Sequence, residues 1–394
     1  MILRSRTTWL IVIAGALAIS VPAQDYHGRK AWNLQNDKLS VVITPGGGHI
    51  ASMTLRSGPA AGLNPLWLPP WRSVEPGNWQ GGYYGDPPGA PLLSSILGDN
   101  ICLDFFGAPS KPETDAGIPV HGEAPCLNWK VDKVTGSSLT YSTTLPAAQM
   151  HAVRKITLTR GSTAIWIDET VTNLSPLDRP FGWNQHVTLG PPFLREGESF
   201  YDLSVSWSKV YPREFSKEER LKRGAEFEWP NAPASKGGEI DLREYPKGKP
   251  NSDFTAGLIP ANRKWGFFTA VNVKKGLVIG YVWPRKEWPW IANWEENHSR
   301  SGKPWLGKAV ARGMEFGTTP YPDSRRDMVT MGQLHGTPVY RWISAKATQK
   351  ISYGAFVAAV PAGTTGVKDV TVDGSRIKVI LDGVDKTLSL AITK

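Results

Sequence analysis

Short runs rich in β-branched and aliphatic residues recur along most of this sequence, whereas long stretches with helical periodicity are nearly absent. The runs lie at residues 39–43, 50–55, 139–143, 154–158, 164–172, 266–271, 278–283, 350–358 and 367–392. The 40 glycines and 32 prolines supply turns between them. Because this spacing is typical of antiparallel sheets, the sequence predicts an all-β chain built as a large antiparallel β-sandwich.

The first 23 residues have the pattern of a cleaved export signal. Arg4 and Arg6 form a short basic region, residues 9–19 are apolar, and Val-Pro-Ala at residues 21–23 precedes an expected cut at Gln24. The apolar run is shorter than the roughly 20 residues that span a bilayer. We therefore expect a signal peptide at residues 1–23, a periplasmic or extracellular location, and no stable membrane insertion after cleavage.

The charge distribution argues against a nucleic-acid partner. The formal net charge is +10, but the basic residues are scattered along the sequence instead of forming one stripe. The 17 tryptophans are compatible with a carbohydrate ligand, since aromatic rings stack on the apolar faces of sugars, and also with packing in a sandwich core. Composition therefore gives mild support to a sugar ligand.

Two cysteines, Cys102 and Cys126, are present. In an oxidising compartment they are expected either to form one disulfide or to remain two buried thiols. Their spacing does not resemble a CxxC metal site, and the sequence contains no HExxH, EF-hand or GxSxG pattern. No metal site is predicted.

Two segments are expected to be long excursions from the sheets. Residues 63–111 combine Pro-Pro and Gly-Gly pairs with several aromatic residues, as in ordered functional loops. Residues 212–251 are charged, and residues 217–224 within them are predicted to form one short helix. The alternating pattern of residues 366–394, with Asp-Gly turns, predicts a closing hairpin, and a small separate module is the alternative.

Four segments carry a recognisable set of motifs. Residues 168–193 are predicted to form a strand, a Pro-containing turn and a second strand with Trp183, Gln185 and His186. Residues 312–320 are strand-like and contain Glu315, residues 117–123 form a turn with His121, and residues 44–52 are predicted to form a hairpin. In this order and spacing, the segments resemble the galactose mutarotase-like (aldose 1-epimerase) superfamily. The resemblance spans about residues 38–358 and implies one large sandwich domain at residues 24–394.

The resemblance also implies a chemistry. In mutarotation a base removes the proton of the anomeric hydroxyl while an acid protonates the ring oxygen, so the ring opens and closes on the other face. Carried over position by position, Glu315 is the base, His186 is the acid and His121 binds the sugar.

Trp183 and Gln185, which precede His186 on its predicted strand, are further expected substrate-binding residues. Trp294 is another, in the Trp-rich segment 283–300, which is expected either to wall a sugar pocket or to pack as a loop over the sandwich edge. No cofactor is implied. Arg312 is not included among the catalytic residues. It precedes Glu315 by three positions, and residues three apart on a strand point to opposite faces of the sheet.

This chain departs from the superfamily pattern at two positions. Gln185 stands where Asn precedes the catalytic His, and Glu123 replaces the Arg after His-Gly, so we expect a different sugar specificity. The sequence is therefore compatible with three alternative functions. The protein is an exported aldose 1-epimerase-like enzyme, a non-catalytic carbohydrate-binding protein with the same sandwich, or a polysaccharide-active enzyme. The third is least favoured because the chain has no room for the helical domain that such enzymes usually add. The oligomeric state stays open.

Overall fold

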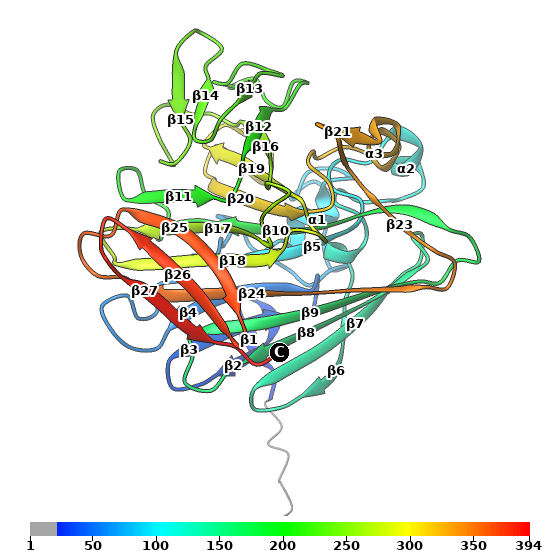
Figure 1. Cartoon of the computed structure of the whole chain (residues 1–394). Helices are drawn as coiled ribbons and strands as arrows, with labels where there is room; N and C mark the ends of the chain where they lie inside the picture. Colours follow the sequence, from blue (N-terminus) through cyan, green and yellow to red (C-terminus); the bar gives the residue numbers. More distant parts are fainter. Residues whose placement is uncertain (1–21) are drawn as a thin grey trace, which may run out of the picture.

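The computed structural model describes residues 22–394, and most of the predicted signal peptide lies outside these residues. The described chain is built around two large antiparallel sheets (Figure 1). The first has twelve strands in the order β1 (Gln24–Tyr26), β2 (Arg29–Gln35), β3 (Leu39–Thr44), β4 (His49–Leu55), β5 (Asp99–Asp104), β10 (Arg179–Leu189), β20 (Val310–Gly317), β19 (Trp290–Asn297), β16 (Phe254–Leu258), β12 (Trp207–Val210) and β13 (Glu226–Phe227), with β23 (Arg341–Ile343) paired to one end of β10.

The second sheet has eight strands and packs against the first. Its order is β11 (Ser199–Leu203), β17 (Trp265–Asn272), β18 (Leu277–Pro284), β24 (Thr348–Ala359), β9 (Ala164–Asn173), β8 (Met150–Leu158), β7 (Ser138–Leu145) and β6 (Lys130–Val134). The large antiparallel sandwich predicted from the sequence is therefore confirmed. Strands were correctly predicted within β3, β4, β7, β8, β9, β17, β18 and β24.

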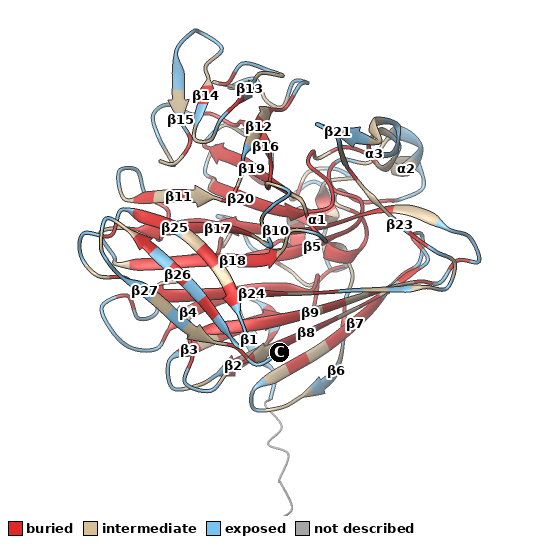
Figure 2. Ribbon diagram, in the orientation of Figure 1, coloured by how far each residue is buried: buried red, intermediate tan, exposed pale blue. Residues whose placement is uncertain are grey.

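The central strands of the twelve-stranded sheet are buried on both faces (Figure 2). Leu103, Val187 and Phe316 point toward the eight-stranded sheet and form the main apolar core with it. On the opposite face, Cys102 and Trp294 pack beneath residues 63–98 and 105–111 in a second apolar cluster. The excursion predicted at residues 63–111 is interrupted by β5, which belongs to the sheet itself. Successive side chains of a strand point to opposite faces of the sheet. Consecutive residues of one strand therefore contribute to different apolar clusters.

The helical segments within residues 22–394 are short: α1 (Ala90–Ser95), α2 (Lys111–Asp115), α3 (Arg325–Met331) and the 3₁₀ turn η1 (Ala124–Cys126). Two small hairpins, β14 (Asn231–Pro233) with β15 (Glu239–Asp241) and β21 (Gln333–Leu334) with β22 (Thr337–Pro338), complete the periphery. In this part of the chain no helix has the length and apolar character needed to cross a membrane.

The C-terminal segment forms a sheet of its own. The predicted closing hairpin has a third strand, so that β25 (Gly366–Asp373), β26 (Arg376–Asp382) and β27 (Thr387–Ala391) make a three-stranded antiparallel sheet. It lies against the outer face of the eight-stranded sheet (Figure 1), where Val370 and Val379 meet Phe267 and Val271 in an apolar cluster. This arrangement leaves the outer face of the twelve-stranded sheet to the other loops.

The short helix predicted at residues 217–224 is wrong. The backbone N–H groups of Arg220 and Leu221 donate to the carboxylate of Asp253, and the N–H of Lys222 donates to the carbonyl of Pro233. These N–H groups are therefore engaged outside the segment, and no i to i−4 ladder forms. Competition from a neighbouring carboxylate has overridden the local helical preference.

Candidate active site

Strand β10 divides its side chains between two environments. Asn184, His186 and Thr188 face the loop-covered side of the twelve-stranded sheet, whereas Trp183 and Gln185 point into the core between the sheets. This division follows from the period of two along a strand. The predicted acid, His186, therefore lies on the side of the sheet that can receive a ligand.

His186 and Glu315 meet directly. The two residues are opposite each other in the register of β10 and β20, and His186 Nε2 donates to Glu315 Oε1 over 2.9 Å. On its other side, His186 Nδ1 lies 3.0 Å from Thr188 Oγ1. Both members of the pair are almost fully buried, at 3% and 2% exposure. The two residues predicted to be acid and base are thus held on one face of adjacent strands.

His121 comes from a turn yet joins the same site. It has a positive φ of 65°, and the following Gly122 approaches the backbone of Leu103 so closely that a Cβ would lie 2.2 Å from its carbonyl oxygen. The ring of His121 stacks on Phe106 with centroids 5.4 Å apart and lies 4.9 Å from the ring of His186. The structure therefore brings three predicted residues, His121, His186 and Glu315, together.

The protonation of His121 follows from its surroundings. Burial lowers its pKa well below the usual value, and the nearby His186 and Arg300 add to this effect. The backbone N–H of Gly107 donates to His121 Nδ1 over 3.0 Å, so the ring proton of the neutral form resides on Nε2. His121 is accordingly a neutral imidazole with one N–H left to donate.

These residues line a cavity of about 360 Å³. Much of its wall is apolar and aromatic, with Leu92, Val120, Phe215, Phe254, Trp294 and Trp305 among the lining residues. Arg300 lies over the rings of Trp294 and Trp305, with its guanidinium carbon 5.1 and 4.8 Å from the ring centres, and pairs with Glu296 over 3.3 Å. Aromatic walls with a few convergent polar groups are typical of small-molecule sites. Trp294, predicted to bind substrate, lies in this wall.

The structure does not bring Trp183 and Gln185 to the cavity. Inside the sandwich, one carboxylate oxygen, Glu169 Oε2, accepts two hydrogen bonds. Trp183 Nε1 donates to it over 2.9 Å and Gln185 Nε2 over 2.8 Å. Glu123, which replaces the superfamily's Arg, accepts from the N–H groups of Ala147 and Ala148 and does not line the cavity either. These polar side chains support the fold around the site.

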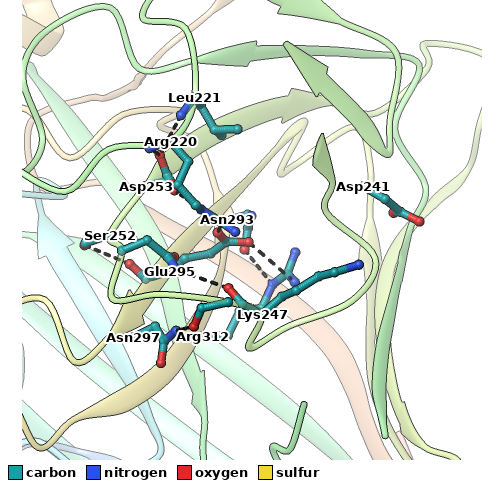
Figure 3. A network of polar contacts seen from close by, with 12 residues as sticks. Arg220, Leu221, Asp241, Lys247, Ser252, Asp253, Asn293, Glu295, Asn297 and Arg312 are labelled. Carbon is teal, nitrogen blue, oxygen red and sulfur yellow. Dashed lines mark hydrogen bonds and ion pairs between the residues drawn. The ribbon is translucent and has the colours of Figure 1, made fainter. Parts of the chain in front are cut away.

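Arg312 points away from Glu315, as the period of two predicts. It is fully buried, donates to Asn293 over 2.7 Å, and lies 3.7 Å from Glu295, with its guanidinium 4.0 Å from the ring of Tyr201. Glu295 also pairs with Arg220, so Arg312 belongs to a network on the far side of β19 and β20 from the cavity (Figure 3). Its position supports the two strands and has no access to a bound sugar.

Cys102 and Cys126 are two free thiols in the structure. Burial raises the pKa of the Cys102 thiol well above its usual value, and the carboxylates of Glu315 and Asp99 raise it further. This thiol therefore remains protonated and is a poor nucleophile. Within residues 22–394, no group of three or more His, Cys, Asp and Glu side chains is arranged to hold a metal ion.

The fold was compared with those of known proteins. No protein-family model and no curated protein matches the sequence. Among solved structures, a candidate aldose 1-epimerase from Klebsiella pneumoniae subsp. pneumoniae superposes with a TM-score of 0.59 at 13% identity, covering 84% of this chain and 80% of that one. A candidate aldose 1-epimerase from Escherichia coli K12 gives 0.56 at 13% identity, covering 84% and 99%. This chain has the galactose mutarotase-like fold.

A third structure supports the same assignment. The galactose mutarotase related enzyme from Lactobacillus acidophilus has a TM-score of 0.54 at 12% identity, covering 84% of this chain and 98% of that one. The superfamily resemblance inferred from four short motifs is thus borne out at the level of the galactose mutarotase-like fold. At these identities the comparison establishes architecture, and the chemistry has to be argued from this chain's own residues.

Several residues that line the cavity or contact its His186 were not anticipated individually. Thr188 follows His186 by two positions, so the strand period could have placed it on the same face. Tyr211, Phe254 and Trp305 come from distant segments, and no local pattern links them to the site. Arg300 comes from the end of the Trp-rich segment 283–300, which also supplies Trp294 to the cavity wall.

Proposed function

We propose that this protein is an exported aldose 1-epimerase-like enzyme that interconverts the anomers of a reducing sugar by acid and base catalysis. The observation that carries the proposal is the contact of His186 Nε2 with Glu315 Oε1 at 2.9 Å beside the cavity. A histidine and a carboxylate side by side at a cavity can give one proton and take another, which is what the acid and the base of mutarotation must do.

The reaction needs a base and an acid close to one carbon atom. The anomeric hydroxyl and the ring oxygen are both bonded to C1, so the groups that take and give the proton must themselves be neighbours. In this step ionised Glu315 accepts the hydroxyl proton while His186, which must be the imidazolium to serve as the acid, gives its Nε2 proton to the ring oxygen; the C1–O5 bond breaks and leaves an open-chain aldehyde, a protonated Glu315 and a neutral His186. Rotation about C1–C2 and reversal of the transfers close the ring as the other anomer.

The other cavity groups fit supporting roles in this proposal. Glu315 Oε2 is buried and has no hydrogen-bond partner within residues 22–394, so it is available to accept from the anomeric hydroxyl. His121, neutral with its proton on Nε2, can donate to a sugar oxygen without adding charge to the site. Trp294 and Trp305 offer aromatic surface for the apolar face of a sugar ring.

The test is the rate at which the purified protein relaxes freshly dissolved α-glucose and α-galactose, followed by polarimetry. Acceleration is expected for the wild type and a loss of about 10²-fold or more in kcat for Glu315→Gln, which keeps the shape but cannot act as a base. Glu214→Gln, at the rim of the same cavity, is the control and should retain activity. Sugar binding without acceleration would instead identify a non-catalytic carbohydrate-binding protein.

Export is proposed from the N-terminal sequence alone. The basic start, the apolar run and the Val-Pro-Ala preceding residue 24 predict cleavage before Gln24. Mass spectrometry of the protein recovered from the periplasm or medium of a bacterial host checks this directly. A mature N-terminus at Gln24 is expected, whereas an intact Met1 in the cytoplasmic fraction would contradict export.

A further inference from the structure

The cavity lined by His186 and Glu315, here called the inner cavity, lies next to a second one, here called the outer cavity. The outer cavity measures about 610 Å³ and shares Ala108, Tyr211 and Pro322 with the inner cavity. The two cavities therefore adjoin at these three residues.

The outer cavity differs in chemistry from the inner one. It is lined by side chains that donate and accept hydrogen bonds, including Ser110, Lys111, Ser324, Arg326 and Thr330. Several of these residues are exposed, so this cavity opens at the protein surface between α2 and α3. Hydroxyl, ammonium and guanidinium groups at a surface opening suit a polyhydroxylated ligand that is partly solvated.

The wall that joins the cavities is fixed. Tyr211 donates its hydroxyl to Asp323 over 2.7 Å, and its ring packs against Phe254 and Tyr321 with centroids 5.9 and 5.3 Å apart. Arg213 pairs with Asp323 and, over 3.2 Å, with Asp327, which holds the base of the outer cavity. Tyr211 is 8% exposed and the Arg213 guanidinium lies over its ring at 5.4 Å, so the junction is a preorganised wall whose exposed edge a second sugar ring can contact.

The chemistry of the inner cavity determines which end of a ligand that spans both cavities lies next to Glu315. This step rests on the proposed function, because opening of the ring needs a free anomeric hydroxyl next to Glu315. The sugar in the inner cavity must then be a reducing end, and any further sugar must be attached through one of its other hydroxyls. We infer that the substrate is a reducing oligosaccharide whose terminal ring occupies the inner cavity and whose next unit occupies the outer cavity.

Blocking the outer cavity tests this inference. Thr330→Trp places a large side chain in it, and Val329→Trp is the control, because Val329 is an exposed neighbour on α3 that does not line the outer cavity. Anomer exchange is measured by exchange NMR for glucose, galactose and their β-1,4- and α-1,4-linked trisaccharides. Binding of each sugar is measured in parallel by isothermal titration calorimetry.

For the wild type and Val329→Trp, affinity and kcat/KM should be at least about tenfold higher for a trisaccharide than for its monosaccharide. In Thr330→Trp this preference should disappear while monosaccharide values stay unchanged. Equal affinity for single sugars and trisaccharides, a preference unaffected by Thr330→Trp, or no binding of any of these sugars would overturn the inference. Trisaccharide binding that depends on the outer cavity but gives no anomer exchange would support the inference and contradict the proposed catalysis.

Discussion

Thr188 fixes the imidazole of His186 from the side opposite Glu315. Its hydroxyl lies 3.0 Å from His186 Nδ1 and is fully buried, so this contact holds the ring in the orientation that turns Nε2 toward Glu315. Thr188→Val removes this contact with little change in shape, and kcat should fall about 10-fold or more with KM nearly unchanged. Thr188→Ser keeps the hydroxyl and should recover most of the rate. Similar losses in both variants would contradict an orienting role.

His49 links the stability of the fold to pH. It is fully buried, its Nδ1–H donates to the carbonyl of Gly46 over 3.0 Å, and burial lowers its pKa well below the usual value. The unfolded chain binds a proton at this residue below about pH 6.5, whereas the folded chain does not. Stability is therefore lost as the pH falls below that value.

The size of this effect is measurable by difference. Between pH 7.5 and 5.5 the wild type should lose about 1.4 kcal/mol of unfolding free energy through His49. His49→Asn retains a donor toward Gly46 but cannot titrate, so urea unfolding of this variant should show a correspondingly smaller loss over the same range. Contributions from His121 and the buried carboxylates act in both proteins and cancel in the comparison. Parallel pH profiles would show that His49 is not neutral in the folded state.

At the scale of elements, the C-terminal sheet covers the outer face of the eight-stranded sheet. Val370 lies at the centre of β25, pairs with Val379 and is fully buried in the apolar cluster between the two sheets. Val370→Asp buries an unpaired carboxylate there and should lower the free energy of unfolding by about 3 kcal/mol or more. Lys368→Asp, an exposed position on the same strand, should cost less than about 1 kcal/mol.

The cavity lies on the other sheet, so its activity provides a second readout for Val370→Asp. At a temperature where the variant is still folded, anomer exchange per folded molecule should equal that of the wild type. A loss of exchange without loss of fold would mean that the C-terminal sheet influences the site.

Strand prediction from the sequence succeeded where strands are rich in β-branched residues and failed at two central strands. From the sequence, β5 and β19 are predicted to lie in loop segments. All of their residues are buried, so neither sequence shows the alternation of apolar and polar residues that marks a half-exposed strand. Their Asn, Asp and Glu residues belong to the types that are depleted in strands. Residues 63–98 and 105–111 cover one face of these strands and the eight-stranded sheet covers the other, and this tertiary arrangement has no local signature.

The candidate site was predictable to the extent that motif and strand period agreed. His186, Glu315 and His121 came from short motifs, and the period of two correctly separated Arg312 from Glu315. The same rule applied to β10 places Trp183 and Gln185 on the face opposite His186, which is where the structure has them. Neighbours in the sequence of a strand are not neighbours in a site, and the distant loops of the cavity could not be located without the fold.

At the scale of the whole molecule, one buried arginine connects the two large sheets. Arg154, on β8 of the eight-stranded sheet, donates to the carbonyl of Gly48 over 2.8 Å and contacts Asp99 of the twelve-stranded sheet over 3.1 Å. It also contacts Glu169 over 3.0 Å, and all three charged groups are fully or almost fully buried. Burial raises the pKa values of Asp99 and Glu169, and the attraction of Arg154 opposes this rise.

Arg154→Met leaves two carboxylates inside the sandwich without their cation. We expect the free energy of unfolding at pH 7.5 to fall by about 3–5 kcal/mol, because breaking a buried ion pair strands its partners. Without Arg154 the pKa values of Asp99 and Glu169 rise further, so protonation stabilises the folded variant as the pH falls, and its deficit relative to the wild type should shrink toward pH 5. Arg160→Met, at an exposed turn after β8, is the control and should change little.

Urea unfolding of these variants at pH 7.5 and 5 separates two ways of holding a sandwich together. A large deficit at pH 7.5 that narrows at pH 5, and that Glu169→Gln partly relieves in the double variant, would show that ionic contacts across the core set the stability of the whole molecule. A deficit independent of pH would assign the cost to lost packing around the arginine stem. A variant as stable as the wild type at both values would mean that apolar packing alone holds the two sheets.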